Sequence, residues 1–201
     1  MNIIPHRGIW GNEDQKNSIA AISDALEFFD GVELDLRDHP EGIIVAHDPF
    51  SSGALLQDIL ADLSTSQRKK FFALNIKADG LASGIQDLLT SFGIRHYGCF
   101  DLSFPEKKRY LDLGLKVLDR RSDLETNPTT TTGEVVDCFE YELPVQTLNL
   151  SRLQFLISPE LHGRDPAPYW RELKQSVAAD SSKLFICTDF PFELEEFWRN
   201  G

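Results

Sequence analysis

Apolar positions along the chain recur with two alternating periods, one typical of strands and one typical of helices. Short apolar or alternating runs predict strands that begin near residues 2, 32, 71, 97, 115, 134, 153 and 183, with an additional strand over 43–46. Amphipathic stretches predict helices over 17–29, 55–63, 80–92, 169–177 and 192–199, and another that begins at Pro105. Helices that separate successive strands favour a parallel sheet.

Eight strand–helix units predict an α/β fold, specifically a compact (β/α)8 TIM barrel that forms a single domain over residues 1–201. Because 201 residues lie near the lower limit of that fold, we expect some helices to be short or missing. The weakest helical patterns lie over 122–133 and 140–152. An open doubly wound sheet is the structural alternative.

Charge and composition narrow the class of partner. The chain has 20 Lys and Arg against 32 Asp and Glu, a formal net charge of −12, which argues against nucleic acid and anionic membrane surfaces. No apolar stretch approaches the length of a membrane span, and no signal peptide is recognisable, so we expect a cytoplasmic protein without stable membrane insertion. The three cysteines are far apart in the sequence, and we expect them to be buried small hydrophobic residues.

Ionisable and polar residues recur where the predicted strands end, which is where barrels carry their chemistry. Glu33 and Asp35 stand out, because residues two apart on a strand point to the same face, opposite Val32 and Leu34. Two like charges on an interior face need a cation or strong donors, so this pair predicts a metal or ion-pair site. The polar strand-end residues are His6, Arg7, Glu33, Asp35, Arg37, His47, Asp48, Asn75, Lys77, Asp101, Arg121, Asp137, Glu160, His162 and Asp189.

Two histidines accompany the carboxylate pair. His6 begins the tripeptide that ends the first strand, followed by Arg7, which can hold a phosphate, and Gly8, which permits a tight turn. His47 follows another strand beside Asp48. Two histidines near an ion-binding carboxylate pair suit acid–base work on a phosphodiester, one for the nucleophile and one for the leaving oxygen.

The ordered set His6-Arg7-Gly8, Asn17-Ser18, Glu33-Leu34-Asp35 and His47-Asp48 resembles the glycerophosphodiester phosphodiesterase family. The resemblance implies a (β/α)8 barrel, a divalent cation (Mg²⁺ or Ca²⁺) and a role in lipid metabolism. It makes His6 and His47 the catalytic acid–base pair. By the same resemblance, the remaining roles are phosphate or substrate binding for Arg7 and Lys77, metal ligation for Glu33 and Asp35, and support of the first loop for Asn17.

Two positions depart from the family pattern. Lys16 stands where the family usually has Glu, and Asn75 stands where the family has a metal-binding Glu in the third strand. The Asn75 carbonyl oxygen still suits a hard cation, but one negative charge is gone, so we expect weaker metal binding. Asp101 or Glu160 are candidates for additional ligands, Arg121 and His162 for further phosphate or sugar contacts, and Asp48 for support of His47.

The preferred hypothesis is a phosphoric diester hydrolase that splits a small glycerophosphodiester-like substrate into an alcohol and a phosphomonoester such as glycerol phosphate. One alternative is a non-catalytic binder of a phosphorylated sugar or polyol, supported by Asn75. Another is a lyase-like enzyme in which a substrate hydroxyl attacks and a cyclic phosphate forms. A glycoside hydrolase built on paired carboxylates ranks low, because it leaves the histidines and Arg7 without a role.

Overall fold

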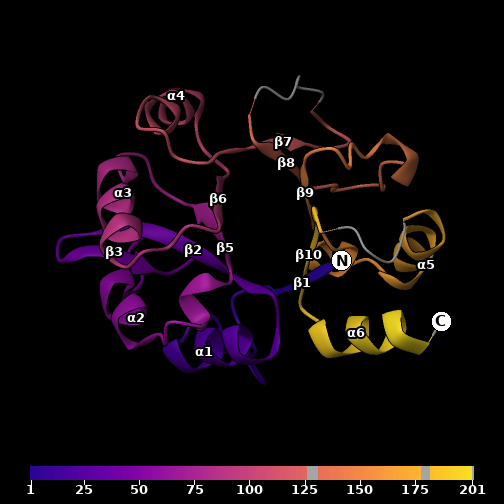
Figure 1. The fold of residues 1–201 in the computed structure, drawn as a ribbon, viewed down its shortest axis with the longest axis horizontal. Coiled ribbons are helices and arrows are strands. Elements are labelled where there is room, and N and C mark those ends of the chain that lie inside the picture. The colour runs from indigo at the N-terminus through magenta and orange to yellow at the C-terminus, as the bar shows by residue number, and fades with distance from the viewer. Residues whose placement is uncertain (126–130, 178–181, 201) are drawn as a thin grey trace. The chain divides into compact units, whose positions relative to one another are not determined.

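The computed structural model describes residues 1–125, 131–177 and 182–200 (Figure 1). Within these ranges the strands are β1 (Asn2–Pro5), β2 (Gly31–His39), β3 (Gly42–Val45), β4 (Ala54–Leu55), β5 (Phe71–Ile76), β6 (Tyr97–Phe100), β7 (Leu118–Arg121), β8 (Gly133–Val136), β9 (Leu153–Ile157) and β10 (Leu184–Thr188). The α-helices are α1 (Ile19–Phe28), α2 (Leu56–Asp62), α3 (Ala82–Ser91), α4 (Phe104–Asp112), α5 (Ala167–Ser176) and α6 (Pro191–Asn200). Short 3₁₀ helices cover Glu13–Gln15, Gln67–Lys69, Val145–Thr147 and Pro159–His162.

The chain forms two compact units. Unit 1 combines Met1–Pro5 with Leu118–Gly201, and unit 2 is the continuous stretch His6–Val117. Each unit has one sheet of five strands, in the order β1-β10-β9-β8-β7 in unit 1 and β4-β3-β2-β5-β6 in unit 2. The single domain over 1–201 stays a prediction.

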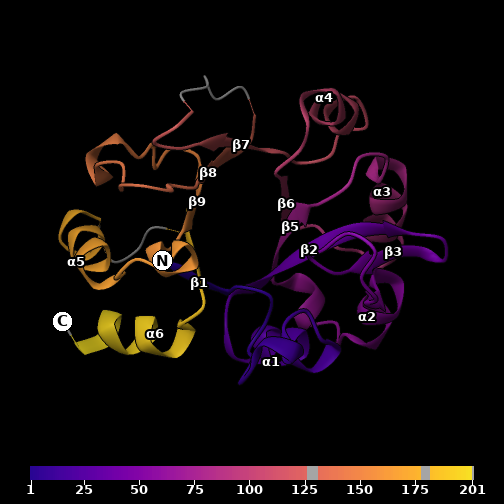
Figure 2. The same cartoon turned by 180° about the vertical axis from the view of Figure 1, so that it is seen from behind.

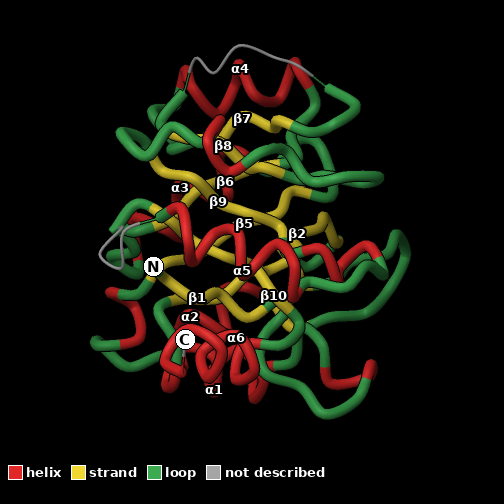
Figure 3. The backbone as a smooth tube through the Cα atoms, turned by 90° about the vertical axis from the view of Figure 1, so that its right-hand side faces the viewer, coloured by secondary structure: helices red, strands yellow, loops and turns green. Residues whose placement is uncertain are grey.

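The sheet of unit 1 is parallel throughout, because every pairing from β1 to β7 is parallel. Strands are drawn in yellow and helices in red in Figure 3. In unit 2, β2, β5 and β6 are parallel, while β3 and β4 continue the sheet as an antiparallel extension. The expected parallel α/β architecture is therefore confirmed, and the additional strand predicted over 43–46 is the antiparallel β3.

All eight predicted parallel strands are present in the described residues, as β1, β2, β5, β6, β7, β8, β9 and β10. The closed barrel that they would form stays a prediction. The predicted weak helical regions contain one 3₁₀ turn over Val145–Thr147, while residues 126–130 of the other region lie outside the described residues.

One strand prediction was displaced. The apolar run 115–118 indicated a strand there, but β7 begins at Leu118, and Val117 makes only an isolated bridge to Cys99. The strand continues through Asp119, Arg120 and Arg121, whose charges hide it from a hydrophobicity pattern. Burial of Asp119 is compensated by the Thr131 hydroxyl, which donates to its carboxylate at 3.0 Å.

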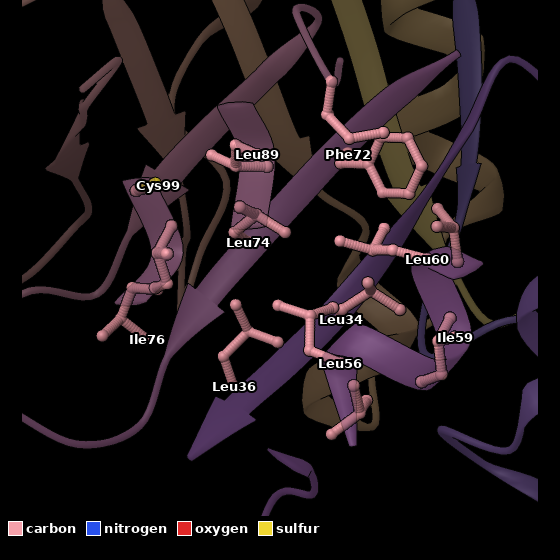
Figure 4. Packing of buried hydrophobic residues seen from close by; sticks show 14 of the residues in the cluster. Leu34, Leu36, Leu56, Ile59, Leu60, Phe72, Leu74, Ile76, Leu89 and Cys99 are labelled. Carbon is pink, nitrogen blue, oxygen red and sulfur yellow. The ribbon is translucent and has the colours of Figure 1, made fainter. Parts of the chain in front are cut away.

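The core of unit 2 lies between its sheet and its helices. α1 packs against β2, while α2 and α3 pack against β3 (Figure 2). Figure 4 shows Leu34 and Leu36 of β2 beside Leu74 of β5, with Leu56 and Leu60 of α2 packed nearby. These side chains are almost completely buried, so apolar burial on this face fixes β2 and directs its alternate residues to the other face.

All three cysteines are buried free thiols, as expected. In the described part of the chain, no helix has both the length and the apolar character needed to cross a membrane.

Gly8 and Gly80 provide a matched test of close packing. Both have φ of +92°, but a Cβ on Gly8 would lie 2.5 Å from the Ala21 carbonyl carbon, whereas a Cβ on Gly80 would meet nothing within 4 Å. We expect Gly80→Ala to cost about 1 kcal/mol, the penalty of a left-handed conformation. Gly8→Ala adds a backbone clash and should cost at least about 2 kcal/mol more. Urea denaturation measures both, and equal losses would contradict the packing argument.

Candidate active site

The carboxylates of Glu33 and Asp35 lie on the face of β2 that is opposite its apolar core residues. Glu33 is 1% exposed and Asp35 is not exposed at all. Asp35 lies opposite Asn75 in the parallel pairing of β2 with β5, and Asn75 is also buried. The strand alternation therefore brings two acidic side chains and one amide to the same interior face, as predicted.

Arg7 joins the two carboxylates. Its Nε lies 2.7 Å from Asp35 Oδ2, and its backbone N–H donates to Glu33 Oε2 at 3.2 Å. Asn17 Nδ2 donates to the same Asp35 oxygen at 3.0 Å, and the Asn17 N–H donates to the Arg7 carbonyl at 2.9 Å. Arg7 and Asn17 both have left-handed backbones, with φ of 59° and 60°. The loop after β1 thus accepts strain at two residues, and both of them bind Asp35.

Lys77 follows β5 and supplies the second cation. Its Nζ lies 3.5 Å from Asp35 Oδ1 and 3.8 Å from Asp101 Oδ2. Both separations exceed the length of a usual N–H···O hydrogen bond, so the ammonium lies between two carboxylates without closing on either. Two cations therefore face the buried acidic pair, Arg7 from the loop after β1 and Lys77 from the end of β5.

The two histidines have different surroundings. His6 is 14% exposed, its Nε2 lies 4.0 Å from Glu33 Oε2, and the Trp10 indole N–H donates to its carbonyl at 3.0 Å. His47 is more exposed, and its Nδ1 lies 2.8 Å from Asp48 Oδ1. The hydrogen bond with His47 holds the pKa of Asp48 below its usual value. Asp48 thus anchors one nitrogen of His47, as its predicted supporting role requires.

Arg37, to which the sequence analysis assigned no role, contacts the backbone of His47. Its Nε and its NH2 group donate to the His47 carbonyl at 3.2 and 2.8 Å. The signal was present in the strand alternation, which places Arg37 on the same face as Glu33 and Asp35. His47 and Arg7 both line one groove of about 660 Å³, together with Lys16 and Asn17.

Burial raises the pKa of Glu33 to about 7, and the neighbouring Asp35 carboxylate acts in the same direction. His6, Arg7 and Lys77 oppose this rise by their positive charge. A further positive charge beside Glu33 would favour the ionised form of its carboxyl group.

The oxygens that remain around the pair fit a hard divalent cation. Glu33 Oε1, Asp35 Oδ1 and Asn75 Oδ1 are buried and accept no hydrogen bond from the described residues. Carboxylate and amide carbonyl oxygens are the ligands that Mg²⁺ and Ca²⁺ take in proteins. Within the described ranges, no group of three or more His, Cys, Asp or Glu side chains could hold a metal ion. A ligand set at this position would therefore have to include the amide oxygen of Asn75.

The other predicted site residues belong to unit 1, where they are held by local partners. Arg121 donates to the Thr147 carbonyl at 3.1 Å, and its Nε lies 3.6 Å from Glu134 Oε2. His162 Nε2 lies 2.6 Å from Asp137 Oδ1. The sequence indicated neither set of partners, because these residues are distant in sequence and meet only in the fold.

Glu160 is part of a hydrogen-bonded clamp between the ends of β9 and β10. Ser158 Oγ donates to its Oε2 at 2.5 Å, while Thr188 Oγ1 and the Asp189 N–H donate to its Oε1 at 2.5 and 3.1 Å. Both carboxylate oxygens are thus engaged within unit 1. These hydrogen bonds join the ends of β9 and β10, and the role of Glu160 as an additional metal ligand stays a prediction.

Comparison with known proteins identifies the fold. No protein family matches the sequence, and no curated protein matches it. Solved structures of glycerophosphodiester phosphodiesterases do match. The one from Agrobacterium tumefaciens is 17% identical, with a TM-score of 0.63 and full coverage of both chains. The one from Thermotoga maritima is 17% identical, with a TM-score of 0.64 over 96% of this chain and 97% of that one. The chain has a glycerophosphodiester phosphodiesterase-like fold.

The raised pKa of Glu33 predicts a pH-dependent stability in the presence of a chelator. Since folding favours the protonated carboxyl, this stabilisation is complete below about pH 4.5 and is lost as the pH rises through about 7. Between pH 5 and 8 we expect wild type to lose on the order of 2 kcal/mol more unfolding free energy than Glu33→Gln does. Denaturant titrations at several pH values measure this difference, and parallel pH profiles for the two proteins would contradict it.

Proposed function

We propose that this chain is a metal-assisted phosphodiesterase that hydrolyses a small glycerophosphodiester-like substrate to an alcohol and a phosphomonoester. The observation that carries the proposal is the convergence of Arg7 and Lys77 on the buried carboxylate pair, beside three oxygens that accept no hydrogen bond from the described residues. The fold shared with solved glycerophosphodiester phosphodiesterases supports the same reaction class.

In the proposed mechanism, Arg7 and Lys77 bind the phosphoryl oxygens of the substrate. The Nε of Arg7 pairs with the Asp35 carboxylate, and its terminal N–H groups would donate to the substrate. Glu33, Asp35 and Asn75 would hold Mg²⁺ or Ca²⁺, which supplies neutralisation of the charge that develops on the phosphoryl oxygens. The Lys77 ammonium can donate hydrogen bonds to the substrate, because both neighbouring carboxylates lie beyond ordinary hydrogen-bond length.

Proton transfer is assigned to the two histidines. One takes the proton of the attacking hydroxyl, which belongs to water or to the substrate itself, and the other gives a proton to the departing alcohol oxygen. Asp48 and Arg37 orient His47, with the carboxylate stabilising its protonated form and leaving its Nε2 for the substrate. Glu33 lies close enough to His6 to stabilise a positive charge on that ring.

We further propose that the protein acts in lipid metabolism in the cytoplasm, where its three buried thiols stay reduced, and that its eight parallel strands close into one (β/α)8 barrel.

Removal of either histidine tests the acid–base assignment. We expect His6→Ala and His47→Ala each to lower kcat on glycerophosphodiesters by about 10²- to 10⁴-fold. His96→Ala is the matched control, because His96 is exposed and lies just before β6, at the amino end of that strand. Phosphorus NMR of the products separates hydrolysis from cyclic-phosphate formation. If both variants keep wild-type activity, the two-histidine mechanism is wrong, and ligand binding without turnover would favour the phosphorylated-polyol binder.

The metal assignment is tested by restoring the missing carboxylate. A chelator should abolish turnover, and Mg²⁺ or Ca²⁺ should restore it. Asn75→Asp replaces a neutral ligand by a charged one, so we expect about tenfold tighter binding of the divalent cation by calorimetry. Gln57→Glu adds the same charge on the exposed surface of α2 and should leave the affinity unchanged. Cation binding that ignores the Asn75 substitution would contradict the proposed ligand set.

A further inference from the structure

Lys77 occupies an unusual electrostatic position in unit 2. Its side chain is 19% exposed, and its Nζ is shared between Asp35 Oδ1 at 3.5 Å and Asp101 Oδ2 at 3.8 Å. The two carboxylates differ in burial, since Asp35 is completely buried and Asp101 is 23% exposed. An ion pair with the more buried carboxylate is the stronger one, because solvent screens it less. Asp35 alone would therefore draw the ammonium inward.

The backbone places Asp101 where it opposes this attraction. β5 and β6 pair in parallel with Asn75 opposite Phe100, so the residues that follow these strands leave the sheet at the same edge. Asp101 comes directly after β6 and has a left-handed backbone, with φ of 60°. Asp and Asn adopt this conformation more readily than other residues with a Cβ. The turn thus presents a carboxylate to Lys77 at the cost of some backbone strain.

A separate contact holds the two loops together. Ser103 Oγ donates to Asp79 Oδ2 at 3.0 Å, which links the start of α4 to the loop after β5. Ser103 also caps α4 by accepting from the Glu106 N–H. These two contacts tie the loop after β6 to the loop after β5 without using the Asp101 carboxylate. Removal of that charge should change where the ammonium rests and leave the loops in place.

We propose that Asp101 is a positioning residue for Lys77, which it holds away from Asp35 so that the ammonium can bind a phosphoryl oxygen. This inference rests on the proposed function, and it replaces the suggestion that Asp101 is an additional metal ligand. Without Asp101, Lys77 closes on Asp35 Oδ1. Phosphate then loses a donor, and the carboxylate oxygen facing Lys77 becomes less available to a cation.

The test is Asp101→Asn, which removes the charge and keeps a residue type that tolerates the left-handed backbone. At saturating Mg²⁺ we expect KM for a glycerophosphodiester to rise about tenfold, with kcat changed less than threefold. The dissociation constant for glycerol 3-phosphate, measured by calorimetry, should rise by a similar factor. The matched control is Asp87→Asn, which makes the same chemical change on the exposed surface of α3 and should leave both values within about twofold of wild type.

The same Asp101 substitution in a Lys77→Met variant shows whether Asp101 acts by positioning Lys77, by binding a metal or by supporting the local structure. In Lys77→Met, addition of Asp101→Asn should have no further effect on glycerol 3-phosphate binding or on Mg²⁺ binding, because the residue acts through Lys77. A metal ligand would weaken Mg²⁺ binding in this background as well. An undiminished effect in Lys77→Met, an equal effect of Asp87→Asn, or wild-type binding by Asp101→Asn would each overturn the inference.

The calorimetric arm also distinguishes the inference from the proposed function. If the wild-type protein binds glycerol 3-phosphate but does not turn over a phosphodiester, the hydrolase assignment fails, while the dependence of binding on Asp101 still decides the positioning role. If the wild type binds no glycerol 3-phosphate, both fail. If turnover and binding are normal and Asp101→Asn matches wild type, only the positioning role fails.

Discussion

The buried carboxylate of Asp35 is the constraint on which the rest of unit 2 depends. A charge with no exposure to solvent is tolerated only when donors and cations replace the lost water. Arg7 and Asn17 supply them from the loop after β1, and both adopt left-handed backbones to do so. Lys77 arrives from the neighbouring strand. The strained loop and the positions of both cations therefore serve the same purpose, which is to stabilise the buried Asp35 carboxylate.

Sequence periodicity predicted this region well because one pattern carries both the packing and the chemistry. Leu34 and Leu36 pack into the helix-covered core, and the same alternation sends Glu33 and Asp35 to the opposite face. The parallel pairing of the strands followed from the helices that separate them in the sequence. The pattern failed at β7, where Asp119 and Arg121 continue a strand that apolar residues had indicated only over 115–118.

The roles of unit 1 residues were harder to predict, because a side chain's partners are settled by loops that are distant in sequence. Glu160 looked like a free acid at a strand end, yet it accepts hydrogen bonds from Ser158 and Thr188 and joins β9 to β10. Arg121 is engaged by Thr147, and His162 by Asp137. A strand-end position identifies residues that can carry chemistry, but local hydrogen bonding decides which of them remain available for a ligand.

The net charge of the groups around Asn75 suggests why a neutral side chain suits this position. Glu33, Asp35 and Asp101, when ionised, contribute three negative charges, and Arg7 and Lys77 contribute two positive ones. The cluster alone thus has one excess negative charge, and the divalent cation that we propose would leave one excess positive charge. A phosphodiester has a single negative charge, so this balance favours its entry and neutralises it. With a carboxylate at position 75, the loaded cluster would be neutral and would attract the substrate less. Under the proposed function, Asn75 would therefore weaken cation binding and strengthen the attraction for the anionic substrate, in a chain whose overall charge of −12 opposes that attraction.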